Sequence, residues 1–141
     1  MRTLRIVATG LLALTAIPGG LALIVGFHAP PVEMLRGSLF RSFVVPGLAL
    51  TLVVGGSALA ATVLLLRRSP TGPAASGVAG LVVMAFEFVQ VVSIGSPPGA
   101  SRAMQVGYFA LGTLLVASAL VAPRAANPPG PDATSARATD R

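Results

Sequence analysis

Glu87 is an ionisable residue within the apolar stretch VVMAFEFVQVV, which runs from Val82 to Val92. The chemical question is how its carboxyl group is accommodated there. A charged carboxylate at the centre of a bilayer costs on the order of 2.5 to 3.5 kcal/mol on insertion scales. We therefore expect Glu87 to stay protonated, to face a polar partner or to face a wet cavity.

Other polar residues are expected at a similar depth of the neighbouring apolar segments, namely Gln90, Thr51, Gln105 and Tyr108. Together with Glu87 they would line a small intramembrane site in which the carboxyl group gains and loses a proton, as proton-coupled movement of a cation or amphiphile requires. The alternative is structural. A protonated Glu87 would donate a hydrogen bond to a backbone carbonyl or a Gln side chain, and such bonds contribute about 0.6 kcal/mol on average. We favour this structural interpretation and retain the proton site as the second hypothesis.

The rest of the sequence carries few signals of catalysis or cofactor binding. There is no cysteine, and the single histidine, His28, has no second His or Cys with which to form a metal site. The ten basic residues are all Arg and do not gather into the stripe expected of a nucleic-acid interface, despite the net charge of +6. We expect no enzyme activity, no catalytic residue, no metal, no cofactor and no nucleic-acid partner.

The elements that would position Glu87 are long apolar segments. Hydrophobic residues make up 54% of the chain, charged residues only 10%, and the mean hydropathy is +0.84. Four runs, residues 6–27, 43–66, 74–95 and 103–122, are each close to the ~20 residues that a helix needs to cross a bilayer. They predict an all-α fold, a four-helix transmembrane bundle with short loops. The first run is too long for a typical signal-peptide core, so we interpret it as a retained helix.

The distribution of arginines predicts the orientation of the bundle. Five of them, Arg2, Arg5, Arg67, Arg68 and Arg124, fall on one side of the predicted helices, and three, Arg36, Arg41 and Arg102, fall on the other. By the positive-inside rule, both termini are expected to be cytoplasmic in a multi-pass protein of the cell (inner) membrane. We assign residues 1–124 to the transmembrane domain and residues 125–141, which are rich in proline and small polar residues, to a disordered cytoplasmic tail.

Small residues and one loop complete the expected architecture. Gly55, Gly80 and Gly112 lie among small residues at helix-contact spacing, which in lipid lets backbones approach closely within a bundle or in a dimer. The loop of residues 28–42 is predicted to contain a short helix at the membrane surface.

The junction between this loop and the second helix carries a family resemblance. Its pattern LxxSxFxxFxxPGL comprises Leu35, Ser38, Phe40, Phe43 and the sequence Pro46-Gly47-Leu48. It resembles a motif of small four-span bacterial (actinobacterial-like) integral membrane proteins without an assigned function. In the third span, Phe86 stands where those proteins often carry Trp, and Gln90 follows it four residues later. The resemblance implies an integral membrane location and no known activity.

The sequence therefore predicts a multi-pass membrane protein with a structural or accessory role. The alternative is a small proton-coupled transporter or ion-conducting protein that uses Glu87. The expected partners are the lipid bilayer and either a second copy of the chain or another envelope protein.

Overall fold

The computed structural model describes residues 1–27, 31–37, 40–96 and 98–121, and all regular elements in these ranges are helical. Helix α1 comprises Arg2–Ile24, and the 3-10 helix η1 comprises Val32–Leu35. The second span is continuous and consists of α2 (Val44–Leu48), the π-helix η2 (Ala49–Gly55) and α3 (Gly56–Leu66). Helices α4 (Gly72–Ile94) and α5 (Ala100–Leu120) complete the fold.

Four helical segments are long and apolar enough to cross a membrane: Arg2–Ile24, Val44–Leu66, Gly72–Ile94 and Ala100–Leu120. The predicted all-α bundle of four transmembrane helices is confirmed, with ends that differ from the predicted ones by a few residues. The predicted loop helix appears as the single 3-10 turn η1. The predicted tail, residues 125–141, lies outside the described residues.

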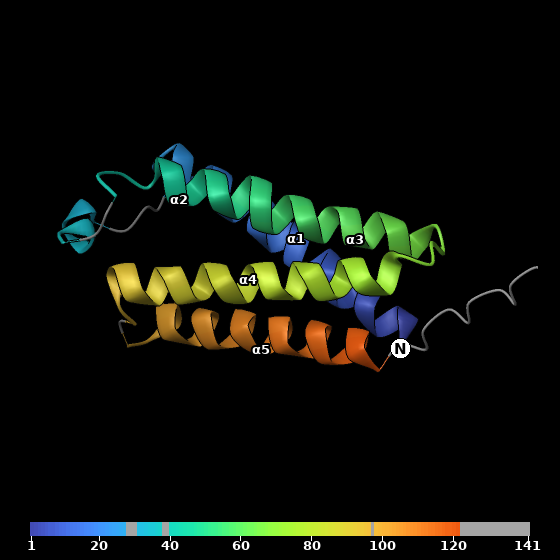
Figure 1. The fold of residues 1–141 in the computed structure, drawn as a ribbon. Coiled ribbons are helices and arrows are strands. Elements are labelled where there is room, and N and C mark those ends of the chain that lie inside the picture. Colours follow the sequence, from blue (N-terminus) through green and yellow to red (C-terminus); the bar gives the residue numbers. More distant parts are fainter. Residues whose placement is uncertain (28–30, 38–39, 97, 122–141) are drawn as a thin grey trace, which may run out of the picture.

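The helices form two closely packed pairs, α1 with the second span and α4 with α5 (Figure 1). Helix α1 crosses the bundle diagonally, so its start lies near the end of α5 and its end lies near α2 (Figure 1). We call the end of the bundle where α1 begins the N-terminal end, and the opposite end, beside η1, the η1 end. The two pairs lie closer together at the N-terminal end than at the η1 end (Figure 1).

Each pair is held by glycine contacts between backbones. A Cβ atom on Gly80 of α4 would lie 2.6 Å from the carbonyl oxygen of Gly112 in α5, so this crossing requires glycine. A Cβ atom on Gly20 of α1 would lie 2.5 Å from the carbonyl oxygen of Gly47 and 2.1 Å from Oγ1 of Thr51. Such close approach increases van der Waals contact between helices that have little hydrophobic drive to associate in lipid.

The hydrophobic core is built mainly of small side chains, and most of it lies away from the η1 end. It comprises Ala8, Leu12, Ala13, Ala16, Val54, Ala58, Ala61, Ala79, Val83 and Leu115, each at most 4% exposed. The opposite faces of the helices present large apolar residues, such as Leu14, Phe88 and Leu120. This inside-out distribution suits helices that are surrounded by lipid.

Candidate functional site

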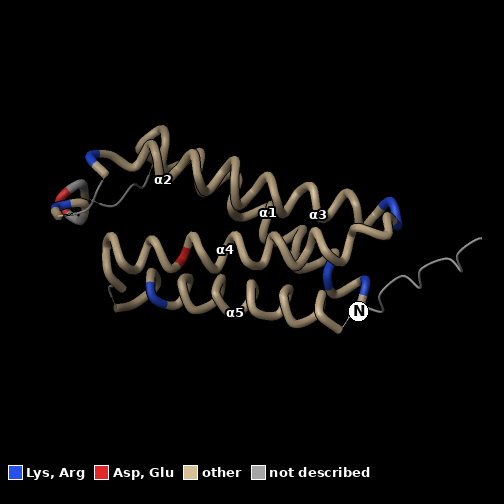
Figure 2. The backbone as a smooth tube through the Cα atoms, viewed as in Figure 1, with Lys and Arg blue, Asp and Glu red and all other residues tan. Residues whose placement is uncertain are grey.

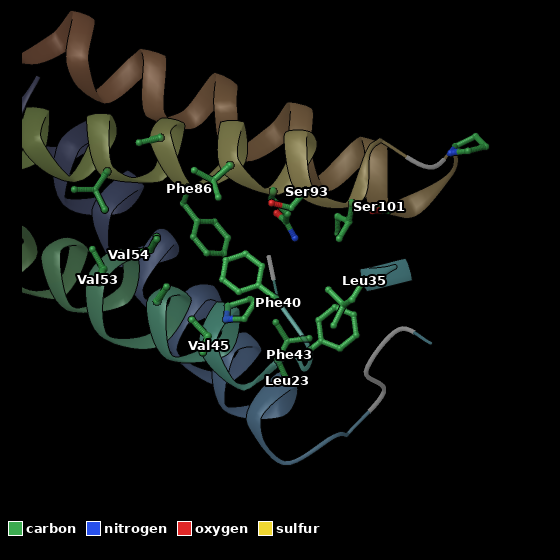
Figure 3. Close-up of a pocket in the computed structure, with 18 residues that line it drawn as sticks. Leu23, Leu35, Phe40, Phe43, Val45, Val53, Val54, Phe86, Ser93 and Ser101 are labelled. Carbon is green, nitrogen blue, oxygen red and sulfur yellow. The ribbon is translucent and has the colours of Figure 1, made fainter. Parts of the chain in front are cut away.

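An apolar cavity of about 620 Å³ lies between the second span and α4, toward the η1 end (Figure 3). The second span contributes Val45, Ala49, Val53 and Val54 to its wall. Helix α4 contributes the row Val82, Phe86, Val89 and Ser93, whose spacing of three and four residues gives one helix face. The volume falls within the ~300 to 1,000 Å³ that is typical of small-molecule sites.

The π-helix η2 forms much of this wall on the second span. Ala49, Val53 and Val54 belong to it and line the cavity. On its other side, Thr51 Oγ1 donates a 3.4 Å hydrogen bond to the carbonyl oxygen of Ile17, and the Gly20 contact holds η2 against α1. The π-helix is thus bound to α1 on one side and presents apolar side chains to the cavity on the other. Single π-turns within α-helices frequently occur at functional sites.

Aromatic and aliphatic side chains from the segment between α1 and α2 line the cavity near the η1 end. Phe40 points toward Phe86 of α4 (Figure 3). Leu35 of η1 and Phe43, which are 5% and 7% exposed, also line the cavity. Described residues of the segment that precedes the second span therefore contribute apolar side chains to the cavity wall at the η1 end.

Glu87 lies on the inner face of α4 and is only 5% exposed. Its side chain is not among those that line the cavity, and its Oε2 atom has no hydrogen-bond partner within the described part of the chain. The contact of Gly80 with Gly112 fixes the register of α4 against α5, and Glu87 is seven residues beyond Gly80. The contact of Gly77 with Ala119 agrees with this register to within about one turn, so Glu87 is level with the stretch of α5 from Gln105 to Phe109.

Gln105 is the second buried polar residue in this layer, at 6% exposed. Its Nε2 atom donates a 3.2 Å hydrogen bond to the carbonyl oxygen of Gly95, just beyond the end of α4. Its Oε1 atom has no partner among the described residues. Glu87 and Gln105 thus each leave one acceptor oxygen unsatisfied in the α4–α5 interface, and an unsatisfied buried group of this kind costs about 1 to 3 kcal/mol.

The other three predicted site residues lie in different surroundings. Gln90 is half-buried and lines the cavity. Thr51 is bonded to α1 on the far side of η2, and Tyr108 is half-buried against the hydrophobic core. Where the chain is described, no hydrogen bond joins any two of the five. The structure therefore places the five predicted residues in four locations: the α4–α5 interface, the cavity wall, the α1–η2 contact and the edge of the hydrophobic core.

A polar network at the N-terminal end was not predicted. Arg5 is 5% exposed, and its Nε and Nη2 atoms donate hydrogen bonds to Oγ and the carbonyl oxygen of Ser118 near the end of α5. Arg2 donates to the carbonyl oxygens of Leu65 and Leu66 at the end of α3, at 3.1 and 3.2 Å. A cation near a helix C-terminus is favourable because it meets the negative end of the helix dipole.

Two threonines extend the network into the bundle. Thr62 Oγ1 donates to Thr9 Oγ1 at 2.8 Å, and Thr9 Oγ1 donates to the carbonyl oxygen of Arg5 at 2.8 Å. The spacing of Arg5 and Thr9, four residues apart, was the available sequence signal for a polar stripe on α1. Some residues that line the cavity belong to patterns noted in the sequence for another reason, namely the loop-to-helix motif and the pair Phe86 and Gln90, but neither pattern indicated a cavity.

Within the described ranges, no group of three or more His, Cys, Asp or Glu residues could hold a metal ion. Comparison of the chain with protein-family models, with curated proteins and with solved structures finds no match in any of the three.

Proposed function

We propose that this chain is an accessory membrane protein that holds the apolar chain of a bilayer amphiphile in the cavity between the second span and α4. The cavity carries this proposal. It lies within the apolar part of membrane-spanning helices, its wall is mostly aliphatic and aromatic, and its volume suits a small-molecule ligand. Amphiphiles are the molecules that surround such helices in a membrane.

The role is non-catalytic in this proposal. The polar side chains in the cavity wall are Gln90, Ser93 and Ser101, and they provide neither a charged nucleophile nor an acid–base pair. The proposal retains the location in the cell membrane, the cytoplasmic termini and the resemblance to small four-span bacterial membrane proteins. The larger number of arginines at the side of the N-terminus supports that orientation.

Native mass spectrometry of the protein purified in mild detergent tests the proposal. We expect one phospholipid to remain bound to the wild-type protein. Ala85 lines the cavity, and Ala85→Phe should fill part of the space and weaken retention at least ~10-fold, which corresponds to about 1.4 kcal/mol. The matched control is Ala110→Phe, because Ala110 is exposed on α5 and does not line the cavity. Equal retention by both variants would refute cavity binding.

The second candidate function is proton-coupled transport through Glu87. The buried Oε2 atom without a partner supports it, since such a carboxyl group is costly to keep and is a frequent feature of proton pathways. In reconstituted vesicles, Glu87→Gln should abolish a pH-driven flux if this candidate is correct. Flux that persists in the variant, or that is absent from both proteins, would favour the accessory role.

A further inference from the structure

We infer that the cavity selects an anionic phospholipid, with one acyl chain in the apolar depth and the headgroup phosphate at three arginines, Arg36, Arg41 and Arg102. This inference rests on the proposed function and adds the class of the ligand. Three observations carry it: the order of polarity along the cavity, the position of the arginines and the charge of the η1 end.

On α4, the polar residues that line the cavity lie toward the η1 end, where the apolar Val89 and Ile94 line it as well. Val82, Ala85 and Phe86 line the part of the α4 wall that is farthest from the η1 end, and all three are apolar. Gln90 and Ser93 follow toward the η1 end, so that about 16 Å of helix separates Val82 from Ser93 at 1.5 Å per residue. A phospholipid has the same order, with hydrocarbon first and ester groups above it. The amide of Gln90 and the hydroxyl of Ser93 are suitable donors to ester oxygens.

Beyond these residues, each of the three arginines directly follows a residue that lines the cavity. Arg36 follows Leu35, Arg41 follows Phe40 and Arg102 follows Ser101. All three arginines are exposed, and the basic positions of this end lie at the η1 segment, beside α2 and near the start of α5 (Figure 2).

Arg102 is positioned by a hydrogen bond from its Nη2 atom to the carbonyl oxygen of Ser96, at 2.8 Å. This bond uses one of the five N–H groups of the guanidinium group and leaves the others available for a phosphate oxygen. Guanidinium groups bind phosphate through paired, charge-assisted hydrogen bonds, which makes Arg the usual residue for this recognition.

The charge of the η1 end agrees with an anionic ligand. Its described residues include the three arginines and one acidic side chain outside the membrane span, Glu33, which gives a net charge of +2. The arginines at the N-terminal end differ, because Arg2 and Arg5 are hydrogen-bonded to the ends of α3 and α5. Among the described arginines, only the three at the η1 end directly follow residues that line the cavity of 620 Å³.

Competition between two lipids with identical acyl chains tests the inference. Purified protein is incubated in detergent with equal amounts of phosphatidylglycerol, which is anionic, and phosphatidylcholine, which is zwitterionic, and the bound lipid is measured by native mass spectrometry. We expect the wild-type protein to retain phosphatidylglycerol in roughly tenfold excess, and we expect added salt to reduce this preference.

A triple variant, Arg36→Gln, Arg41→Gln and Arg102→Gln, should lose the preference while it still binds phosphatidylcholine. The control is the double variant Arg67→Gln and Arg68→Gln, since both residues are exposed at the N-terminal end, and it should behave as the wild type. Equal binding of the two lipids by the wild type would overturn the inference and leave the proposed function intact. Binding of neither lipid would overturn both. A preference that survives in the triple variant would assign the headgroup to other residues and also refute the inference.

Discussion

The two ends of the helix bundle differ in how closely their helices pack. At the N-terminal end, small side chains such as Ala58, Ala61 and Ala79 are completely buried, and the buried polar residues Arg5 and Ser118 are hydrogen-bonded to each other. Toward the η1 end, the same helices line a cavity of about 620 Å³, and the buried Glu87 and Gln105 each have one oxygen without a partner among the described residues. The helices are therefore in close contact at the N-terminal end, whereas at the η1 end they make fewer contacts and leave a cavity between them.

This difference indicates where stability and binding reside. A dry apolar cavity forfeits dispersion contacts along its lining, so an unfilled cavity of this size is costly unless a ligand supplies the missing contacts. In a bilayer, lipid acyl chains that could fill the cavity are always present. We therefore attribute the stability of the fold mainly to the N-terminal half, and the proposed binding of an amphiphile would take place in the η1 half.

The largest expected effect comes from adding the same bulky side chain to each half. Ala79 is 0% exposed in the core, so Ala79→Phe should prevent stable folding, because overpacking a filled core usually costs about 1 to 3 kcal/mol and a full ring can cost more. Ala85→Phe places the ring in the cavity and should leave the unfolding temperature nearly unchanged. Thermal unfolding followed by circular dichroism in detergent measures both. Similar losses in the two variants would mean that the halves are equally packed.

Removal of the buried arginine should have the next largest effect. Arg5→Gln loses the hydrogen bonds to Ser118, and bonds to a charged group are worth about 1.5 to 3 kcal/mol. The same unfolding measurement should show a clear loss of stability. Arg67→Gln is the control, since Arg67 is exposed at the same end and exposed substitutions usually stay within about 0.5 kcal/mol. If Arg5→Gln were as mild as the control, the network would not stabilise the N-terminal half.

A smaller effect, of opposite sign, is expected for Glu87. Glu87→Met keeps a long side chain and removes the buried oxygen without a partner, so we expect stability to rise by about 1 kcal/mol. The exposed Glu33 supplies the comparison, because Glu33→Met should change stability little. A clear loss of stability in Glu87→Met would show that the carboxyl group has a partner that supports the fold.

The sequence predicted the helices better than their arrangement. Uninterrupted apolar runs predict the four spans because each helix must cross the hydrocarbon layer of the bilayer. Helix α1 begins at Arg2 instead of residue 6, and the hydrogen bonds of its first arginines to other helices hold this extra turn in place. The register of α5 against α4 is set by close glycine contacts, such as that of Gly80 with Gly112. The connection between α4 and α5 includes Gly95 and Gly99 at positive φ, so a simple count of residues could not give the register.

The candidate site was predicted only in part for a related reason. The depth of a residue in the membrane can be estimated by counting residues along its helix. From the sequence, Thr51 was grouped with Glu87 because of their similar depth alone. Which face a residue presents depends on which helices pair, and in the structure Thr51 faces α1 through the Gly20 contact. The cavity arises because the two helix pairs separate at the η1 end, and no local pattern of residues encodes that separation.

Quenching of a single tryptophan by a brominated lipid tests the occupancy of the cavity most directly. The chain has no Trp, so Phe86→Trp introduces one indole at the cavity wall, and Leu14→Trp places one on an exposed face of α1. Each variant is titrated in detergent with a phospholipid that is brominated in its acyl chains. We predict that quenching at position 86 saturates at about one lipid per protein, while quenching at position 14 rises steadily with lipid concentration, because a specific site saturates near its Kd. The same unsaturated rise at both positions would show that no lipid chain is held in the cavity and would contradict the account.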